Sequence, residues 1–292
     1  MEILIGYDKS GLSMRRIVVF FCLVLILGMV LGSGCTSAPP TSTAPQTTVI
    51  TPTQVSSESM SALLFATEDY PPYNYIINGS PKGISVDLLR AMAGKLNFTI
   101  VDQKIWVMPW AVSYQVTLER NNTVLFSTVR LPERENLFKW VGPIGTSQKV
   151  IFAKKDRVIN ISSPTDLKQY KIGYINGDAA QAQLKALGIP DNNIVPYSNI
   201  SYLITGAQQN NIDLWCFGDL AGRYFAQQVI GDTNAFTPVY TLDKYDLYYA
   251  FNKDIPDATV KSFQDALDVI RTQPDQSGIT EYQRIIVRNS LF

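Results

Sequence analysis

Histidine is absent from the 292-residue sequence, and its absence excludes several kinds of site. A Ser-His-Asp triad, a Cys-His pair and a histidine-ligated metal centre all need the imidazole ring. Cysteine is scarce as well: Cys22, Cys35 and Cys216 are far apart, without metal-ligand spacing or the pattern of a disulfide framework. We therefore expect no metal ion and no other cofactor.

An excess of charge of one sign is also missing. The 25 Lys and Arg residues are balanced by 25 Asp and Glu residues, and no long basic run occurs. A surface that binds nucleic acid needs such a basic patch or stripe, so we expect no nucleic-acid partner. The length allows two lobes or one large domain.

Long hydrophobic runs are missing too, apart from one near the N-terminus. Arg15 and Arg16 precede the mostly apolar segment Ile17–Leu31. This segment is shorter than the roughly 20 apolar residues that a comfortable membrane span requires. A positive start followed by a short apolar run predicts an export signal peptide over residues 1–34, with Met14 as the alternative start of the chain. An uncleaved anchor is the other interpretation.

The small residues Gly32-Ser33-Gly34 directly before Cys35 resemble the lipobox of prokaryotic lipoproteins. The resemblance implies that Cys35 is lipidated and becomes the mature N-terminus, which would attach the protein to the membrane. A plain signal peptide is the alternative. Residues 35–60 are rich in Thr, Ser and Pro and lack an apolar period, so we expect an extended tether there.

Apolar periodicity begins at about residue 61 and alternates between strand and helix spacing. The first block is expected to contain strands at Ala62–Thr67, Phe98–Val101 and Thr123–Ser127, and helices at Ile84–Leu96 and Pro109–Arg120. A second block repeats the pattern, and the β-rich segments Lys149–Ala153 and Tyr245–Phe251 lie at its edges. Alternating strands and helices predict an α/β fold with a largely parallel sheet. We expect one lobe from residues 61–146 plus 242–292 and a second from residues 147–241, with a ligand cleft between them.

The stretch Leu125–Pro143 combines a strand end, hydroxyl groups, arginines and a helix start. Its polar candidates are Ser127, Thr128, Arg130 and Arg134. Guanidinium groups and helix N-termini both favour anions, so this stretch is a candidate site for an anionic ligand group. The alternative is that the arginines are solvated or paired with Glu133 or Glu135.

Four different short motifs follow one another along residues 62–287. They are Tyr70-Pro71-Pro72-Tyr73 with Gly83–Leu88, Thr128–Arg134 with Phe138-Lys139-Trp140, Asp166-Leu167 with Lys171–Tyr174 and Gly177, and Asn211-Ile212-Asp213 ahead of Asp219. Together they resemble the extracellular solute-binding protein family 3, the polar amino-acid receptors of ABC importers. Each motif is weak by itself, and their order and spacing carry the resemblance.

The resemblance implies a two-lobed periplasmic-binding-protein-like fold of type II, in which two hinge strands let the lobes close on a ligand. It implies a monomeric, lipid-anchored receptor on the extracytoplasmic face of the membrane. Such a receptor captures a small polar solute, an amino acid or a related compound, and delivers it to an ABC transporter permease. One alternative is a ligand-sensing module acting in trans on a membrane receptor. The other, less favoured, is a dehydratase-like enzyme that uses a carboxylate such as Glu68, Asp178 or Asp219.

The resemblance also suggests roles for individual residues. Tyr70 corresponds to an aromatic residue that stacks on the ligand, and Arg134 to the arginine that grips the ligand carboxylate. Ser127 corresponds to a polar contact, and Trp110 lies near the cleft wall. For the two aromatic residues, ordinary packing is the alternative.

Two departures from the family pattern lie on the opposite side of the expected cleft. Asp178 follows Gly177 where Ser or Thr is usual, and it could cap a helix or face the ligand. The position of the usual ammonium-binding aspartate holds Gly218, and Asp219 is one residue further on. The ligand therefore need not be an ordinary α-amino acid, and a small polar or zwitterionic solute with a separate cationic end would suit these two acids.

Overall fold

Short apolar runs become buried strands, as the sequence predicts. Every residue of β1 (Leu64–Thr67) and of β5 (Thr123–Val129) is buried. The structure is a computed structural model that describes residues 57–289. The predicted signal peptide, Cys35 and nearly all of the predicted tether lie outside these residues. Between residues 57 and 289, no helix has the length and apolar character needed to cross a membrane.

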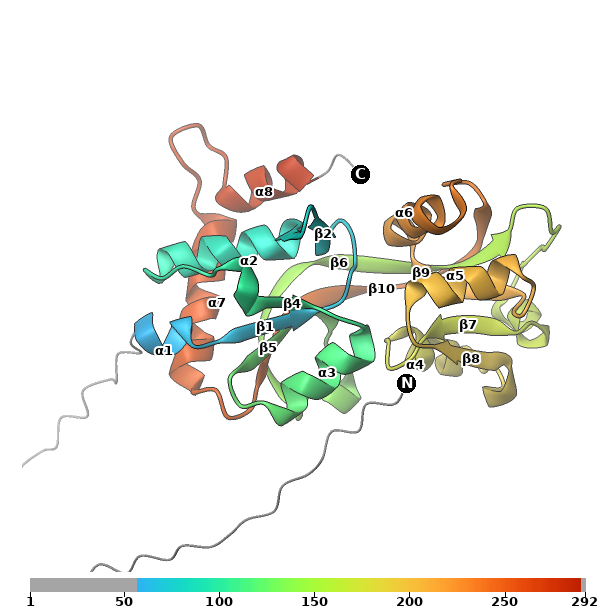
Figure 1. Cartoon of the computed structure of the whole chain (residues 1–292), viewed down its shortest axis with the longest axis horizontal. Coiled ribbons are helices and arrows are strands. Elements are labelled where there is room, and N and C mark those ends of the chain that lie inside the picture. Colours follow the sequence, from blue (N-terminus) through green and yellow to red (C-terminus); the bar gives the residue numbers. More distant parts are fainter. Residues whose placement is uncertain (1–56, 290–292) are drawn as a thin grey trace, which may run out of the picture. The chain divides into compact units, whose positions relative to one another are not determined.

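Eight strands form one mixed sheet in the order β4-β1-β5-β10-β6-β9-β7-β8 (Figure 1). Besides β1 and β5 these are β4 (Ile105–Val107), β6 (Phe138–Lys154), β7 (Ile172–Ile175), β8 (Ile194–Tyr197), β9 (Leu214–Gly218) and β10 (Phe236–Asn252). A separate hairpin consists of β2 (Tyr75–Ile77) and β3 (Ser80–Lys82). Neighbouring strands are parallel in β4-β1-β5 and in β9-β7-β8, as expected for two α/β lobes.

Two long antiparallel strands, β6 and β10, connect these parallel groups. Each has 17 residues, and together they pair with β5 on one side and with β9 on the other. The fold therefore has two lobes with two connecting strands, which confirms the predicted fold class. The predicted lobe boundaries at 146/147 and 241/242 fall inside β6 and β10 and stay a prediction.

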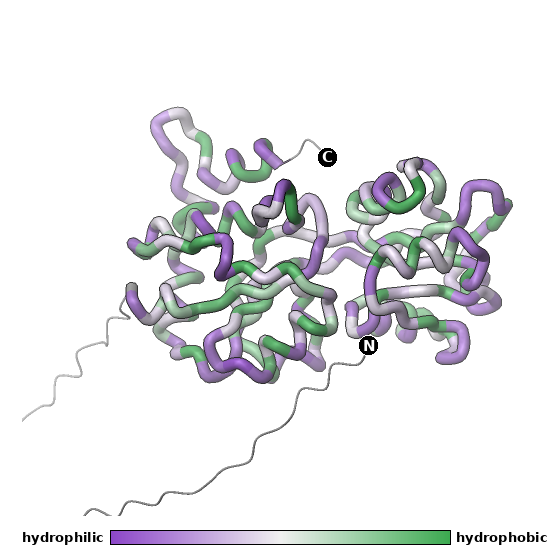
Figure 2. The backbone as a smooth tube through the Cα atoms, in the orientation of Figure 1, coloured by the Kyte–Doolittle hydropathy of each residue, from purple (hydrophilic) through white to green (hydrophobic). Residues whose placement is uncertain are grey.

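Helices pack against both strand groups. The α-helices are α1 (Ser57–Ser61), α2 (Ile84–Lys95), α3 (Trp110–Glu119), α4 (Ala180–Ala186), α5 (Ile200–Gln208), α6 (Asp219–Ile230), α7 (Asp257–Thr272) and α8 (Glu281–Asn289). Short 3₁₀ helices are η1 (Asp102–Lys104), η2 (Pro132–Arg134), η3 (Pro164–Gln169) and η4 (Asp191–Asn193). The apolar side chains of α2 at helical spacing are buried, and Figure 2 shows hydrophobic segments in the central strands and hydrophilic segments in the outer loops.

One predicted strand is wrong. Residues 98–101 are not a strand, and the strand beside β1 is β4, four residues beyond them. Phe98 and Ile100 still pack inside, so their alternating burial is real, but backbone pairing with β1 begins only after η1. The apolar pattern identified buried residues correctly and misplaced the hydrogen-bonded segment.

Candidate functional site

A small cavity of about 10 Å³ lies between residues of the two strand groups. Its charged lining residues are Glu68, Arg134, Lys149 and Asp178, and Tyr70, Ser127 and Ser147 add hydroxyl groups. The lining comes from the ends of β1 and β5, from the connecting strand β6 and from the loop before α4. Sites at the ends of strands between two lobes are where α/β proteins bind ligands.

Arg134 is the least compensated charge in this cavity. It ends η2, directly after β5, and its side chain is only 6% exposed. The guanidinium donates to Thr128 Oγ1 (3.3 Å), to the carbonyl of Val129 (3.2 Å) and to the carbonyl of Gly177 (2.7 Å). Within the described residues no carboxylate forms an ion pair with it. Burial lowers the pKa of Arg134, partly offset by Asp178, so this cation lacks a counter-charge in direct contact.

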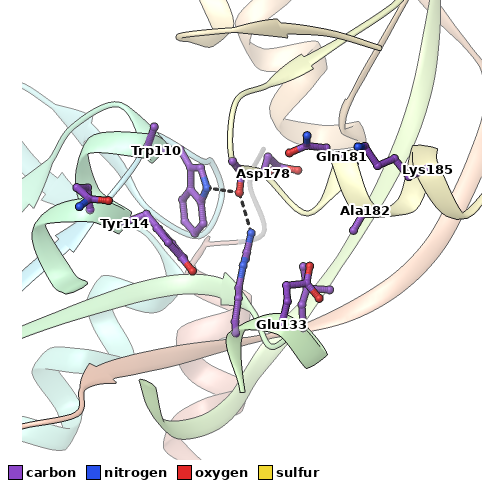
Figure 3. Close-up of a pocket in the computed structure, with 12 residues that line it drawn as sticks. Trp110, Tyr114, Glu133, Asp178, Gln181, Ala182 and Lys185 are labelled. Carbon is purple, nitrogen blue, oxygen red and sulfur yellow. Dashed lines mark hydrogen bonds between the residues drawn. The ribbon is translucent and has the colours of Figure 1, made fainter. Parts of the chain in front are cut away.

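The carbonyl of Gly177 joins Arg134 to Trp110. Trp110 begins α3 and donates its indole Nε1–H to the same carbonyl oxygen at 2.8 Å. Figure 3 marks both bonds with dashed lines, and the guanidinium lies 5.5 Å from the centroid of the Trp110 ring. Gly177 has a φ of +76°, which a glycine adopts without strain. Trp110, Arg134 and Gly177 also line a neighbouring pocket of about 480 Å³.

Lys149 and Asp178 form a buried ion pair on the other side of the cavity. Lys149 Nζ lies 2.9 Å from Asp178 Oδ2, and both side chains are nearly inaccessible. Asp178 Oδ1 also accepts the N–H of Ala180 at 2.6 Å, which caps the start of α4. Burial acts to lower the pKa of Lys149, but the Asp178 carboxylate outweighs it, and the pKa lies above its usual value.

Tyr70 closes a second side of the cavity. Its hydroxyl and Ser147 Oγ share a hydrogen bond of 2.6 Å, and a second pocket of about 230 Å³ lies beyond them. The ring of Tyr70 stacks on Tyr73 with centroids 6.0 Å apart. A Cβ on Gly218 would lie 2.3 Å from Tyr70 Oη, so only glycine leaves room for this hydroxyl. The side chain of Tyr70 is therefore held in place in the cavity wall by Ser147 and Tyr73 and by the lack of a side chain at Gly218.

Glu68 is the acid whose protonation the cavity changes most. Burial, helped by the Asp178 charge, raises the pKa of Glu68 to about 8, despite the opposing effect of Lys149. Its side chain makes no hydrogen bond or ion pair with any residue from 57 to 289. At neutral pH most of this carboxyl group is therefore protonated. The neighbouring Asp69 is also affected, because burial raises its pKa to about 6.

Ser127 and Thr128 occupy an irregular part of β5. Opposite them, Tyr248 pairs with Thr128 and Tyr249 with Phe126, so Ser127 is the extra residue of a bulge. Ser127 has a φ of +59°, unusual for a residue with a side chain, and its Oγ donates to Ser85 Oγ at 2.7 Å. The bulge turns Ser127 into the cavity lining, whereas Thr128 is buried and supports Arg134.

Besides Thr128, two predicted site residues lie outside the cavity lining. Arg130 pairs with Glu135 through two hydrogen bonds and stays about 40% exposed, which is the alternative that the sequence left open. Asp219 begins α6, pairs with Arg223 at 2.9 Å and lines the pocket beyond Tyr70. Their roles as ligand contacts stay predictions.

Sequence reasoning missed Lys149 and Ser147 as site residues, and it considered Glu68 as a polar group of a loop or, less favoured, as a catalytic acid. One signal for Lys149 was present: a lysine directly before the apolar run Val150–Ala153, in a segment expected to connect the lobes. Within the described part of the chain, no group of three His, Cys, Asp or Glu side chains could hold a metal ion.

Comparison with known proteins gives a consistent picture. The sequence model of the bacterial extracellular solute-binding proteins, family 3, matches residues 63–281. A search of curated proteins found no significant match. The match covers every residue of the cavity lining described above.

Three solved structures share the fold at low sequence identity. A histidine kinase sensor domain with similarity to periplasmic binding proteins has a TM-score of 0.66 and 20% identity, covering 78% of this chain and 95% of that chain. A mutant of ArgBP from T. maritima has a TM-score of 0.66 and 17% identity, covering 79% and 96%. The substrate binding protein of an amino acid ABC transporter has a TM-score of 0.63 and 16% identity, covering 77% and 97%. At these identities the likeness concerns the fold.

Proposed function

Since the chain belongs to the bacterial extracellular solute-binding proteins of family 3, we propose that it captures a small polar solute between its lobes and delivers it to an ABC importer. Solute binding is the role of the family. Delivery to a permease is the more specific step, and the likeness to the substrate binding protein of an amino acid ABC transporter supports it. We place the protein on the extracytoplasmic side of the membrane, anchored through Cys35 and acting as a monomer.

The observation that carries this proposal is the guanidinium of Arg134. A buried cation without a carboxylate partner is costly unless something neutralises it. Arginine offers five N–H donors, and the described residues accept three bonds from Arg134. The remaining donors can hold a carboxylate, which would supply the missing charge. Ser127, Trp110 and Tyr70 complete the proposed contact set around it.

The cavity's present volume holds about one water molecule, so a ligand can lie between Arg134 and Tyr70 only when the cavity opens. The bonds of Trp110 and Arg134 to Gly177 and the Tyr70–Ser147 bond join segments on opposite sides of the cavity. Opening therefore breaks these hydrogen bonds, and a bound ligand would replace them when the lobes close. Lobe closure around a ligand is the motion expected of this fold.

A thermal-shift screen against amino acids, amines and small organic acids tests ligand binding. A ligand at a hundredfold its Kd should stabilise the protein by about 2.7 kcal/mol. Arg134→Ala should abolish this stabilisation and leave a folded protein. Arg90→Ala is the matched control, because Arg90 on α2 pairs with Asp102 of η1 and lines none of the three pockets described above. An unchanged ligand shift in Arg134→Ala would contradict the proposed binding site.

A sensing role is the second candidate, and the likeness to a histidine kinase sensor domain favours it. The two roles differ in what a gene deletion removes. Loss of ligand uptake would support import, whereas unchanged uptake with loss of a transcriptional response to the ligand would support sensing. For either role we infer binding without turnover, so the ligand should be recovered unchanged after incubation with the protein.

A further inference from the structure

Among the charged side chains around the cavity, one cation has no partner of opposite charge. Lys149 and Asp178 neutralise each other at 2.9 Å. Glu68 is mostly uncharged at neutral pH, because burial raises its pKa to about 8. Arg134 alone carries a charge that no described residue pairs with. The cavity is therefore suited to a ligand with a net negative charge.

Apart from Glu68, which is mostly protonated at neutral pH, no carboxyl group of the described cavity lining is free to receive a ligand ammonium. One oxygen of Asp178 accepts from Lys149 and the other from the N–H of Ala180. Gly218 has no side chain, and the hydroxyl of Tyr70 fills the space where one would be. Asp219 pairs with Arg223 and lines the pocket on the far side of Tyr70. An ammonium in the cavity would instead meet the Lys149 cation.

The part of the cavity wall where a ligand ammonium would lie consists of neutral hydrogen-bonding groups. The Tyr70 and Ser147 hydroxyls share one hydrogen bond, in which either group can donate. Ser127 adds a third hydroxyl on the cavity wall, and the protonated Glu68 carboxyl can donate as well as accept. Such groups can bind a hydroxyl or a carbonyl oxygen and provide no compensation for a second cation.

We propose that the ligand is a small carboxylic acid that carries a hydroxyl or keto group where an α-amino acid carries its ammonium. Its carboxylate pairs with Arg134, and its neutral oxygen faces Tyr70, Ser147 and Lys149. This inference rests on the solute-binding function proposed above. It differs from the expectation drawn from the sequence, a solute with a cationic end, because Lys149 and Arg223 already occupy the two acids that suggested one.

An ammonium could be accepted in one other way, if Glu68 lost its proton to receive it. The two cases differ in proton balance. An α-amino acid that binds against ionised Glu68 releases close to one proton from the protein at pH 7, whereas a hydroxy or keto acid releases none. Calorimetry in buffers of different ionisation enthalpy measures this proton directly.

The test is isothermal titration with the purified full-length protein and pairs of acids that differ at one group. The pairs are lactate and alanine, glycerate and serine, malate and aspartate, and 2-oxoglutarate and glutamate. For at least one pair we expect the hydroxy or keto acid to bind about 100-fold more tightly, without proton release, because the site leaves an ammonium unpaired. Equal or tighter binding of an amino acid overturns the ligand class and leaves the solute-binding function standing.

The absence of binding by all eight acids also overturns the ligand class. The solute-binding function is then judged separately, by native mass spectrometry of protein purified from its own cells. A small molecule that copurifies with the protein and is lost in Arg134→Ala keeps that function. The absence of any such molecule, together with a negative thermal-shift screen, counts against it.

Glu68→Gln provides an independent readout through pH. The charged or titratable groups around Glu68 are Asp69 and Tyr70 beside it, Arg134 after β5, Lys149 on β6 and Asp178 before α4. Above pH 8 an ionised Glu68 would repel a bound carboxylate, so affinity for the preferred acid should fall several-fold between pH 7 and pH 9. Glu68→Gln should remove this fall. A fall of equal size in the variant, or affinity in the wild type that rises over this range, overturns the proposal.

Discussion

The buried pair of Lys149 and Asp178 allows a sharp test of how the cavity is held together. Lys149→Met keeps the length of the side chain and removes its charge, which leaves the Asp178 carboxylate buried without its cation. Removing one partner of a buried ion pair typically costs about 3–5 kcal/mol. For a domain of this size, each kcal/mol lowers Tm by roughly 2–4 °C, so the expected loss is on the order of 6–20 °C.

Chemical denaturation at pH 7 measures this cost, and a double-mutant cycle assigns it to the pair. The variant Lys149→Met/Asp178→Asn should recover most of the lost stability, because an amide side chain needs no counter-charge and still caps α4. Lys261→Met is the matched control, since Lys261 pairs with Asp265 at an exposed position where about 0–1 kcal/mol is expected. A loss in Lys149→Met no larger than in the control would refute the reasoning, as would a double variant as unstable as the single one.

Two further outcomes follow from the geometry of the cavity. Gly218→Ala places a Cβ 2.3 Å from Tyr70 Oη, so we expect a loss of about 1–3 kcal/mol in urea denaturation, and Gly218→Ala/Tyr70→Phe should recover part of it. The raised pKa of Glu68 should also lower wild-type stability by roughly 3–5 kcal/mol as the pH rises from 4.5 to 8, because burial raises the folded-state pKa to about 8 and the unfolded chain ionises at lower pH; the raised pKa of Asp69 acts in the same direction. Glu68→Gln should remove the contribution of Glu68 and leave a shallower fall, and a wild-type stability that rises over the same range would contradict the assignment.

Local patterns in the sequence identified most of the fold because they report burial and spacing along the chain. The helical spacing of Ile84, Leu88, Leu89 and Met92 predicts α2, and all four side chains are buried. The β-rich segments around Lys149–Ala153 and Tyr245–Phe251 predict two connections, which the structure extends into β6 and β10. The wrong strand at residues 98–101 has the same origin. Side chains can alternate between buried and exposed without the backbone pairing with another strand.

The candidate site could be predicted only in part. Local sequence and the family motifs indicate Arg134 because it lies in a short, ordered stretch after a strand. They cannot reveal that Arg130 forms an ion pair with Glu135 while Arg134 has no carboxylate partner in the described part of the chain. That difference depends on which side of η2 faces the interior. The sequence does not reveal the bulge at Ser127 either, because the bulge exists only where β5 pairs with β10.

The sequence by itself determined the α/β class, the family, the stretch that carries Arg134 and the two departures at Asp178 and Gly218. Only the tertiary structure decided what these departures mean. Lys149 and Asp178 are 29 positions apart, and Tyr70 meets Ser147 across 77. Charge compensation acts through space over a few ångströms, so the partner of a buried charge is fixed by folding and not by its neighbours in the chain. For this reason an acid that seemed free to bind a cation proves to be neutralised, and the cavity is left to attract an anion.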